Sequence, residues 1–268
     1  MVRSWLFAPG HSERMLVRVF DSGADEPLLD LEDGVGPDLK DRARAQVAEV
    51  LRGRSAWVRV NRPGTPECEA DLATVGGLVK GLRLPKVEAA AEVTWVRERL
   101  SGREVPITAT IESAAGAAAV EAICAAAGVT SLTFGNVDFS TDTGTDPDAP
   151  EATLYVRSRM VLASRAAGIE APSDGVYTRY QDDEGLLADA QRARRLGFFG
   201  KSCIHPRQVP VVNAAFSATP AELEWARSVV DAYTRSGGAA TRLEGGEMVD
   251  VPVYERARRL LLLGGAAG

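Results

Sequence analysis

Histidine and cysteine are scarce in this chain of 268 residues. The two histidines, His11 and His205, leave little material for a histidine-rich metal site or a Ser-His-Asp triad. The three cysteines, Cys68, Cys124 and Cys203, are odd in number, far apart and without a C-x-x-C pair. Neither a disulfide framework nor a zinc site is therefore expected, and the cysteine usage fits a reducing cytoplasm.

Long apolar runs and an excess of basic residues are also missing. No apolar run reaches the length that crosses a membrane, and no charged segment followed by an apolar one opens the chain. The net charge of −6 disfavours a general nucleic-acid binder, which would show a basic face. We therefore expect a cytoplasmic protein with neither a membrane nor a nucleic acid as partner. A small anionic substrate remains compatible with this charge, because a local arginine cluster can coexist with a negative total.

Short apolar runs alternate with longer amphipathic segments along the chain. The runs are apolar over most of their length, as in parallel sheets that are covered on both faces. This alternation, without a break in composition, favours one (β/α)8 TIM barrel. An open doubly wound sheet is the alternative, and the lack of G-x-G-x-x-G after the first run weakens it. The predicted strands are 4–8, 27–31, 56–61, 81–85, 106–111, 131–137, 168–172 and 198–204.

Two segments depart from this rhythm. Residues 140–153 are polar and predict a long loop on the strand-end face, which carries the active site in such barrels. Residues 219–222 read Thr-Pro-Ala-Glu, a capping box with proline at the first helical position, and predict a helix to about residue 236. We expect a catalytic barrel at 1–215 and a C-terminal helical extension at 216–268 that forms a lid or a subunit contact.

Two carboxylates close the most apolar predicted strands. Glu112 follows the strand at 106–111, and Asp138 follows the strand at 131–137. A buried charge is costly unless it is paired, so two acids on successive strand ends indicate a shared cation. Their hard oxygen ligands suit Mg²⁺ better than Zn²⁺. The residues alone therefore favour a Mg²⁺ site at the barrel mouth, with structural ion pairs as the competing interpretation.

Other charged residues follow the predicted strands around the same mouth. Glu32 and Asp33 are placed to hold water ligands of the metal. Arg59 comes from a buried strand and suits a substrate carboxylate or a developing oxyanion, or else a structural ion pair. Lys86 and Lys201 leave open a metal-independent aldolase that uses a lysine Schiff base, although an ion pair is favoured for Lys201.

Seven short motifs follow one another along nearly the whole chain. They are RSWLFAPG at 3–10, DLED at 30–33, VRVN at 58–61, LPKVE at 84–88, IES at 111–113, DDEGL at 182–186 and IHPRQ at 204–208. Together they resemble the motifs of citrate lyase β-subunit-like proteins in the HpcH/HpaI aldolase family. Several motifs in the same order are far more specific than any one of them.

The resemblance implies a (β/α)8 barrel that assembles as a homo-oligomer, often a trimer. It implies Mg²⁺ ligands at Glu112 and Asp138, with Glu112 also lying against the substrate. It places the substrate-binding arginine at Arg59, and the acids that hold metal-bound waters at Glu32 and Asp33.

A catalytic acid/base is also implied by the resemblance. In malyl-CoA and citramalyl-CoA lyases of this kind, a C-terminal aspartate from a neighbouring subunit has this role, and its motif resembles residues 248–250 here. Asp250 is therefore the candidate acid/base.

One motif departs from the family pattern. The metal-binding aspartate usually follows Gly-Ala-Glu or a similar run, whereas this chain has Gly135, Asn136 and Val137 before Asp138. The metal ligand is retained, but the substrate-facing surface beside it changes. Gly135 and Asn136 are therefore expected to bind substrate, and the departure leaves the substrate itself open.

The implied activity is that of a Mg²⁺-dependent carbon–carbon lyase. It cleaves a short 3-hydroxyacyl thioester, such as malyl-CoA or citramalyl-CoA, to a 2-oxo acid and an acyl-CoA, or it forms the thioester from them. One alternative is a citrate lyase β subunit that acts on a citryl thioester of an acyl carrier protein. Another is a non-catalytic metal-binding subunit, which the Asn136 and Val137 departure suggests.

Overall fold

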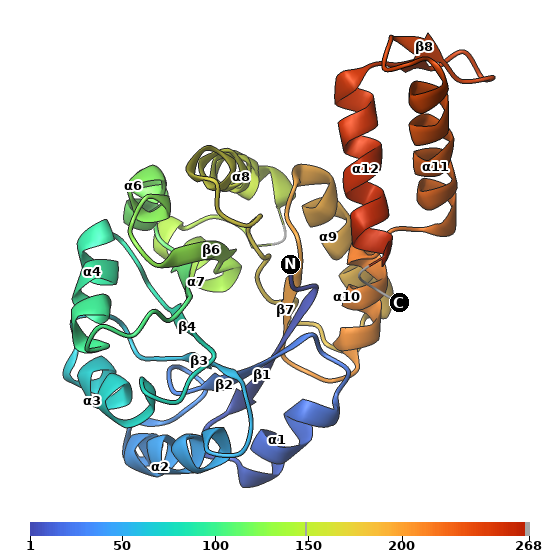
Figure 1. Cartoon of the computed structure of the whole chain (residues 1–268). Helices are drawn as coiled ribbons and strands as arrows, with labels where there is room; N and C mark the ends of the chain where they lie inside the picture. The colour runs from blue at the N-terminus through green and yellow to red at the C-terminus, as the bar shows by residue number, and fades with distance from the viewer. Residues whose placement is uncertain (148, 266–268) are drawn as a thin grey trace. The chain divides into compact units, whose positions relative to one another are not determined.

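The computed structural model describes residues 1–147 and 149–265. The chain divides into two compact units, Met1–Phe216 and Ser217–Gly268. In the first unit, helices surround a curled sheet of parallel strands (Figure 1).

Seven strands form the sheet of the first unit. Their order in the sheet is β6-β5-β4-β3-β2-β1-β7, and each neighbouring pair is parallel. This is the arrangement of a TIM barrel, as the sequence predicts. The strands are β1 (Ser4–Pro9), β2 (Glu26–Asp30), β3 (Trp57–Arg59), β4 (Gly81–Leu84), β5 (Ile107–Ile111), β6 (Val129–Phe134) and β7 (Lys201–Cys203).

Two residues, rather than a regular strand, complete the ring between β6 and β7. Ser173 forms a parallel bridge with Thr133 of β6, and Asp174 forms one with Lys201 of β7. The strand predicted at 168–172 is therefore wrong in position. Gly168 still belongs to the end of the preceding helix, where it adopts the left-handed conformation at φ 71°. Pro172 has no N–H to donate, which keeps the ladder short.

Helices cover the outside of the ring (Figure 1). Between them and the strands lies one large apolar core, which includes Leu6 and Ala8 of β1 and Val93 and Val96 of the fourth helix. The α-helices are α1 (Glu13–Arg18), α2 (Lys40–Leu51), α3 (Pro66–Val75), α4 (Ala90–Arg99), α5 (Ala114–Ala118), α6 (Val120–Cys124), α7 (Asn136–Thr143), α8 (Leu154–Ala167), α9 (Asp183–Leu196) and α10 (Gln208–Phe216). Short 3-10 helices are η1 (Val19–Asp21), η2 (Pro37–Leu39) and η3 (Pro150–Thr153).

The inside of the ring is filled by the other face of the strands. Because side chains alternate along a strand, Trp5, Leu28 and Trp57 form a separate buried cluster from the strand–helix core. The two indoles meet edge to face, with ring centroids 5.0 Å apart. Gly81 of β4 makes room for them, because a Cβ there would lie 2.6 Å from the ring of Trp57. Farther along the same strands, the inward residues become charged.

The polar segment after β6 is not a continuous loop. Residues 140–143 lie in α7, which ends at Gly144 in the left-handed conformation, and residues 150–153 form η3. The loop predicted at 140–153 is therefore wrong at both ends. The helix begins as soon as β6 ends at Phe134, and Gly135 is its N-cap.

The second unit is a pair of helices with a small hairpin. Thr219 Oγ1 accepts a hydrogen bond from the backbone N–H of Glu222 at 3.2 Å, and the Glu222 carboxylate accepts one from Thr219 N at 2.8 Å, so the predicted capping box is present. Ala226, Val229, Val249 and Ala257 form its buried core. Its elements are α11 (Pro220–Arg235), β8 (Thr241–Arg242), β9 (Met248–Val249) and α12 (Val251–Gly265).

None of the helices in the described part of the chain is long and apolar enough to cross a membrane.

Candidate active site

A cavity of about 350 Å³ opens at the carboxyl ends of the strands. Its wall includes the acids Asp33, Glu112 and Asp138, together with Arg59, Gly135 and Asn136, so it brings together six of the predicted site residues. In a TIM barrel this end of the ring carries the catalytic groups. The cavity is therefore the candidate active site.

Arg59 is held at the cavity by a neighbouring strand. Its Nε and Nη2 donate hydrogen bonds to the two carboxylate oxygens of Asp30, both at 2.7 Å. Asp30 also accepts from the backbone N–H groups of Glu32 and Gly34, both at 3.0 Å. Burial opposes ionisation of Asp30, but the Arg59 charge and these hydrogen bonds keep its pKa below the usual value. Asp30 therefore fixes the orientation of Arg59.

Asp30 is not among the predicted site residues. The signal was available, since Asp30 ends a buried apolar strand just as Glu112 follows one.

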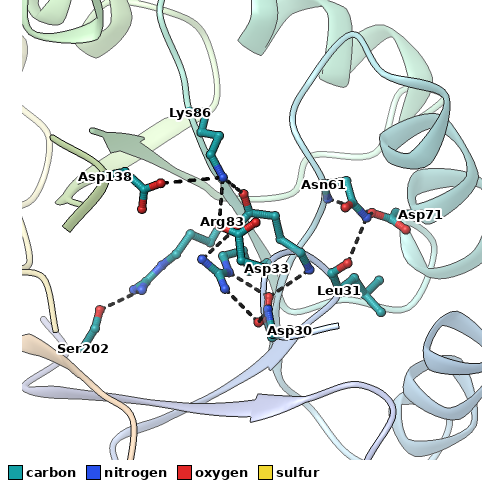
Figure 2. Close-up of polar contacts among 12 residues, drawn as sticks. Asp30, Leu31, Asp33, Asn61, Asp71, Arg83, Lys86, Asp138 and Ser202 are labelled. Carbon is teal, nitrogen blue, oxygen red and sulfur yellow. Dashed lines mark hydrogen bonds and ion pairs between the residues drawn. The ribbon is translucent and has the colours of Figure 1, made fainter. Parts of the chain in front are cut away.

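Lys86 joins the acids on one side of the mouth. Its ammonium makes ion pairs with Glu32 and with Asp33, the second at 2.9 Å, and it lies 4.0 Å from Asp138 (Figure 2). Glu32 is also paired with Arg59 at 2.7 Å. Burial opposes the charged form of Lys86, but Glu32 and Asp33 raise its pKa well above the usual value. An ammonium held in this state is a poor Schiff-base nucleophile.

Glu112 follows β5 directly and is almost fully buried. Its Oε1 accepts one hydrogen bond, from the backbone N–H of Lys86 at 2.6 Å. Burial, followed by the negative charges of Glu32 and Asp138, raises the pKa of Glu112 to about 7. Gly135 is needed beside it, because a Cβ on Gly135 would lie 2.2 Å from Glu112 Oε2. A buried carboxyl group that accepts one hydrogen bond and has no paired counter-ion among the described residues therefore lies directly against the start of α7.

Asp138 lies in the first turn of α7 rather than at the end of a strand. The predicted strand at 131–137 ends at Phe134, which displaces the acid into the helix. Its side chain is 45% exposed, and its charge still acts on Glu112. The two predicted metal ligands thus share the cavity, one buried and one half-exposed.

These donors fit Mg²⁺ in their chemistry. Glu112 and Asp138 offer hard carboxylate oxygens, and Mg²⁺ often takes one or two carboxylates together with waters and substrate. Among residues 1–147 and 149–265, no three acidic, histidine or cysteine side chains converge on one point. The Lys86 ammonium supplies positive charge between Glu32 and Asp138. The position of this ammonium shows that the acidic side chains here favour a cation. The site therefore suits an ion held by two carboxylates rather than a closed protein cage.

Asn136 is the first residue of α7, and its side chain contacts the loop that follows Ser173 and Asp174, the residues that complete the ring. Its Nδ2 donates to the backbone carbonyl of Val176 at 3.1 Å, while its buried Oδ1 has no hydrogen-bond partner among the described residues. The cavity wall also carries Arg83 of β4, which donates to Ser202 Oγ at 2.9 Å (Figure 2). Arg83 is not among the predicted site residues either, although an arginine inside the apolar run 81–85 is a visible signal.

Lys201 lies in a different group of charges, which we call the closure cluster: Arg157, Asp174, Asp189 and Lys201. Its ammonium is buried and donates to Asp174 at 2.7 Å and to Asp189 at 2.5 Å. Arg157 donates to the other oxygen of Asp174 at 2.5 Å. Burial opposes the charge on Lys201, but the two carboxylates raise its pKa. The ion pair favoured from the sequence is present.

Asp250 belongs to the second unit and directly follows β9. Its Oδ1 accepts a hydrogen bond from the backbone N–H of Val253 at 3.2 Å, at the start of α12. The carboxylate therefore caps that helix within its own unit. A side chain at a helix start is held in a defined position.

The sequence matches two family models. Residues 3–206 match the model described as HpcH/HpaI aldolase/citrate lyase, and residues 157–264 match one described as C-C bond lyase of the TIM-barrel fold.

Relatives of known name are similar over most of their length. The chain is 37% identical to the citrate lyase subunit beta of Leuconostoc mesenteroides subsp. cremoris, covering 98% of this chain and 93% of that protein. It is 30% identical to the mitochondrial citramalyl-CoA lyase of Rattus norvegicus, covering 97% and 85% respectively. A crystal structure of CitE from Mycobacterium tuberculosis, in complex with magnesium, acetoacetate and coenzyme A, has a TM-score of 0.85 at 33% identity, covering 98% and 97% of the two chains.

Proposed function

We propose, because this chain belongs to the HpcH/HpaI aldolase/citrate lyase family, that it is a Mg²⁺-dependent carbon–carbon lyase. Its substrate is a short 3-hydroxyacyl thioester of the malyl-CoA, citramalyl-CoA or citryl type. Cleavage gives a 2-oxo acid and an acyl thioester, and condensation is the reverse. The names of the relatives and the bound groups of the Mycobacterium tuberculosis structure support this assignment.

One observation carries the proposal. A buried carboxyl group, Glu112, faces a cavity beside Arg59 and has a single backbone hydrogen bond in place of a counter-ion. Such a group is costly in a purely structural role. A cation that binds there with an anionic substrate balances the charge.

Glu112 and Asp138 would hold the Mg²⁺ ion, and Glu32 and Asp33 would hold water around it. When bound, Mg²⁺ supplies a Lewis acid that polarises the oxygens of the acid end of the substrate. Asp30 keeps Arg59 aimed at the same region. A rigidly held guanidinium binds a carboxylate or a developing oxyanion with little reorganisation.

The chemistry requires one proton to leave and another to arrive. The substrate hydroxyl group gives its proton to solvent water at the open mouth, its oxygen forms the new carbonyl, and the C–C bond electrons pass to the thioester as an enolate. Arg59 stabilises negative charge on the reacting oxygen. Asp250 is the proposed acid that protonates the enolate carbon, and in condensation it removes that proton.

The decisive experiment measures cleavage of malyl-CoA, citramalyl-CoA and citryl-CoA with Mg²⁺ and with EDTA. We expect Mg²⁺-dependent release of a 2-oxo acid. Release that persists in EDTA and is lost on borohydride treatment would instead favour the lysine-based aldolase.

The thioester carrier is tested in the same assay. Activity on a citryl thioester of an acyl carrier protein, without activity on any CoA ester, would assign the citrate lyase β role that one relative bears. Tight binding of Mg²⁺ and a keto acid without turnover of any thioester would assign the non-catalytic metal-binding role.

Asp250 is proposed to act in a neighbouring subunit of a homo-oligomer, with a trimer as the expected assembly. Mixing inactive Asp250→Asn and Glu112→Ala proteins tests this. Activity that returns in mixed oligomers supports a shared site, whereas no return despite proven subunit exchange contradicts it.

The proposed compartment is the cytoplasm. All three cysteines are buried and unpaired, which fits a reducing environment.

A further inference from the structure

Arg83 is the most deeply buried guanidinium at the candidate active site. Its side chain is 2% exposed, and it comes from the middle of β4 at the wall of the cavity. Its Nη1 donates to Ser202 Oγ, a neutral partner, at 2.9 Å. Its Nε and Nη2 are buried and have no hydrogen-bond partner among the described residues. Buried N–H groups of a charged side chain are costly to leave unmatched.

The surroundings of Arg83 do not neutralise it. The rings of Trp5 and Phe7 lie 4.7 Å and 5.7 Å from the guanidinium carbon and offer only their π faces. No carboxylate of the described residues is within ion-pair distance of Arg83. Burial, and then the nearby charge of Arg59, lower the pKa of Arg83 to about 9, and the more distant charges of Glu112 and Asp30 offset this only in part. Among the described residues, the Arg83 guanidinium therefore has no carboxylate in direct contact.

The two arginines of the cavity differ in this respect. Arg59 has Asp30 on one side and Glu32 on the other, at 2.7 Å each. Among residues 1–147 and 149–265, Arg83 has only the Ser202 hydroxyl group as a hydrogen-bond partner. In the cavity wall, Thr110 Oγ1 on the adjacent strand β5 is a further buried polar atom that has no hydrogen-bond partner in the described part of the chain. A guanidinium fork beside a hydroxyl group matches the oxygens of a carboxylate.

We propose that Arg83 binds a second carboxylate of the substrate, so that this cavity selects a thioester whose cleavage gives a dicarboxylic 2-oxo acid. The inference rests on the proposed function, which leaves the acid open. The acid end at Glu112, Asp138 and Arg59 would be common to all substrates of the class. The substituent on the hydroxyl-bearing carbon would reach Arg83.

Three thioesters test this choice, because they differ only in that substituent. Malyl-CoA carries hydrogen, citramalyl-CoA carries CH₃, and citryl-CoA carries CH₂COO⁻. We expect wild-type kcat/KM to favour the citryl substituent by about 100-fold, because the other two leave buried N–H groups unmatched. If CoA esters are not accepted, the same three acyl groups are presented on an acyl carrier protein.

The variant Arg83→Met should lower kcat/KM for the citryl thioester by about 100-fold and change that for citramalyl-CoA by less than about 3-fold. Arg62→Met is the matched control, because Arg62 is exposed and paired with Glu88 outside the cavity. Thermal unfolding establishes that each variant is folded. If Arg83→Met does not fold, Arg83→Lys replaces it, and a selective loss on the citryl thioester is still expected, because an ammonium lacks the fork.

A binding measurement separates this inference from the proposed function. Malate and lactate both carry a 2-hydroxy acid, but only malate has the second carboxylate. Titration with Mg²⁺ present should show at least about 30-fold tighter binding of malate, and Arg83→Met should remove the difference. If no thioester is cleaved but this difference is found, the lyase proposal fails and the assignment of Arg83 stands.

The opposite results overturn the assignment of Arg83. They are a wild-type preference for malyl-CoA or citramalyl-CoA, or an equal loss on all three thioesters in Arg83→Met. Equal binding of malate and lactate by the wild type has the same meaning.

Discussion

Two groups of buried charge lie in the same barrel and are compensated very differently. In the closure cluster, Asp174 accepts hydrogen bonds from both Lys201 and Arg157, and Lys201 has a second carboxylate in Asp189. At the mouth, Glu112 has one backbone N–H as its partner. The first group joins the residues that complete the ring, whereas the second faces a cavity.

The difference teaches that burial of a charge is not by itself a sign of function. A buried charge with its counter-ions in place stabilises the fold, and removing one partner leaves the other charge buried and unpaired. A buried charge without counter-ions favours binding of a ligand of opposite charge. Five predictions test this contrast.

The largest effect is expected for Glu112→Gln. We expect Mg²⁺-dependent cleavage to fall by at least about 1000-fold, because the neutral amide is a much weaker ligand for Mg²⁺. The free energy of unfolding in the absence of metal should stay the same or rise, because a poorly compensated buried charge is removed. Steady-state kinetics and urea unfolding measure the two quantities, with exposed Glu121→Gln as the control. Activity within tenfold of wild type would remove Glu112 from the metal site.

The closure cluster should behave in the opposite way. Asp174→Asn leaves Lys201 and Arg157 buried without their shared carboxylate, so we expect a loss of about 3–5 kcal/mol in the free energy of unfolding. The exposed pair of Asp183 and Arg207 gives the control, since solvent screens this pair and Asp183→Asn should leave the free energy of unfolding nearly unchanged. Equal stability of the two variants in urea would contradict the contrast.

The pKa of Glu112, raised to about 7 mainly by burial, predicts a pH dependence of the metal-free protein. The unfolded carboxyl group releases its proton near pH 4.3, so between that pH and about 7 the folded state binds more protons. The stability from this group is present below the unfolded pKa and is lost as pH rises through about 7. Urea unfolding at several pH values should show this fall, and Glu112→Gln should flatten it.

The proton on the Glu112 carboxyl group competes with Mg²⁺ for the same oxygens. Below pH 7, Mg²⁺ affinity should decrease by up to about tenfold per pH unit, because one proton must leave Glu112 when the ion binds. Calorimetric titration between pH 5.5 and 8.5 measures this dependence. An affinity that stays constant below pH 7 would mean that Glu112 is not the titrating ligand.

A smaller effect is expected for Lys86→Met. Glu32, Asp33 and Asp138 then lose the ammonium that lies among them, and the metal-free protein should lose about 1–2 kcal/mol of stability. Mg²⁺ should raise the melting temperature of this variant more than that of the wild type, because it replaces the missing charge. An equal Mg²⁺-induced shift would show that Lys86 and the ion do not serve the same acids.

The periodic and apolar parts of the barrel could be predicted from the sequence. Covered parallel strands give apolar runs, and an acid directly after such a run, like Glu112, stands out against them. The capping box at Thr219 could likewise be predicted, because its partners lie three residues apart. Local signals of this kind need no knowledge of the rest of the chain.

The parts that escaped prediction depend on distant contacts. The ring-closing residues Ser173 and Asp174 are recognisable only once Thr133 and Lys201 lie on either side of them. The sequence predicts Asp138 at the end of a strand, because Gly135 alone does not indicate that α7 begins directly after it. The role of Arg83 could not be predicted, because its burial depends on contact with Trp5, which is far away in the sequence.

The edge-to-face indoles inside the ring give the barrel an optical property. Of the chain's four tryptophans, Trp5 lies against Arg83 of the cavity wall, and Trp57 lies against Trp5. Both rings are buried, where indole emission responds to local electric fields rather than to bulk water. An anion that neutralises Arg83 changes that field without touching an indole. Intrinsic fluorescence can therefore follow the occupancy of this cavity with no added label.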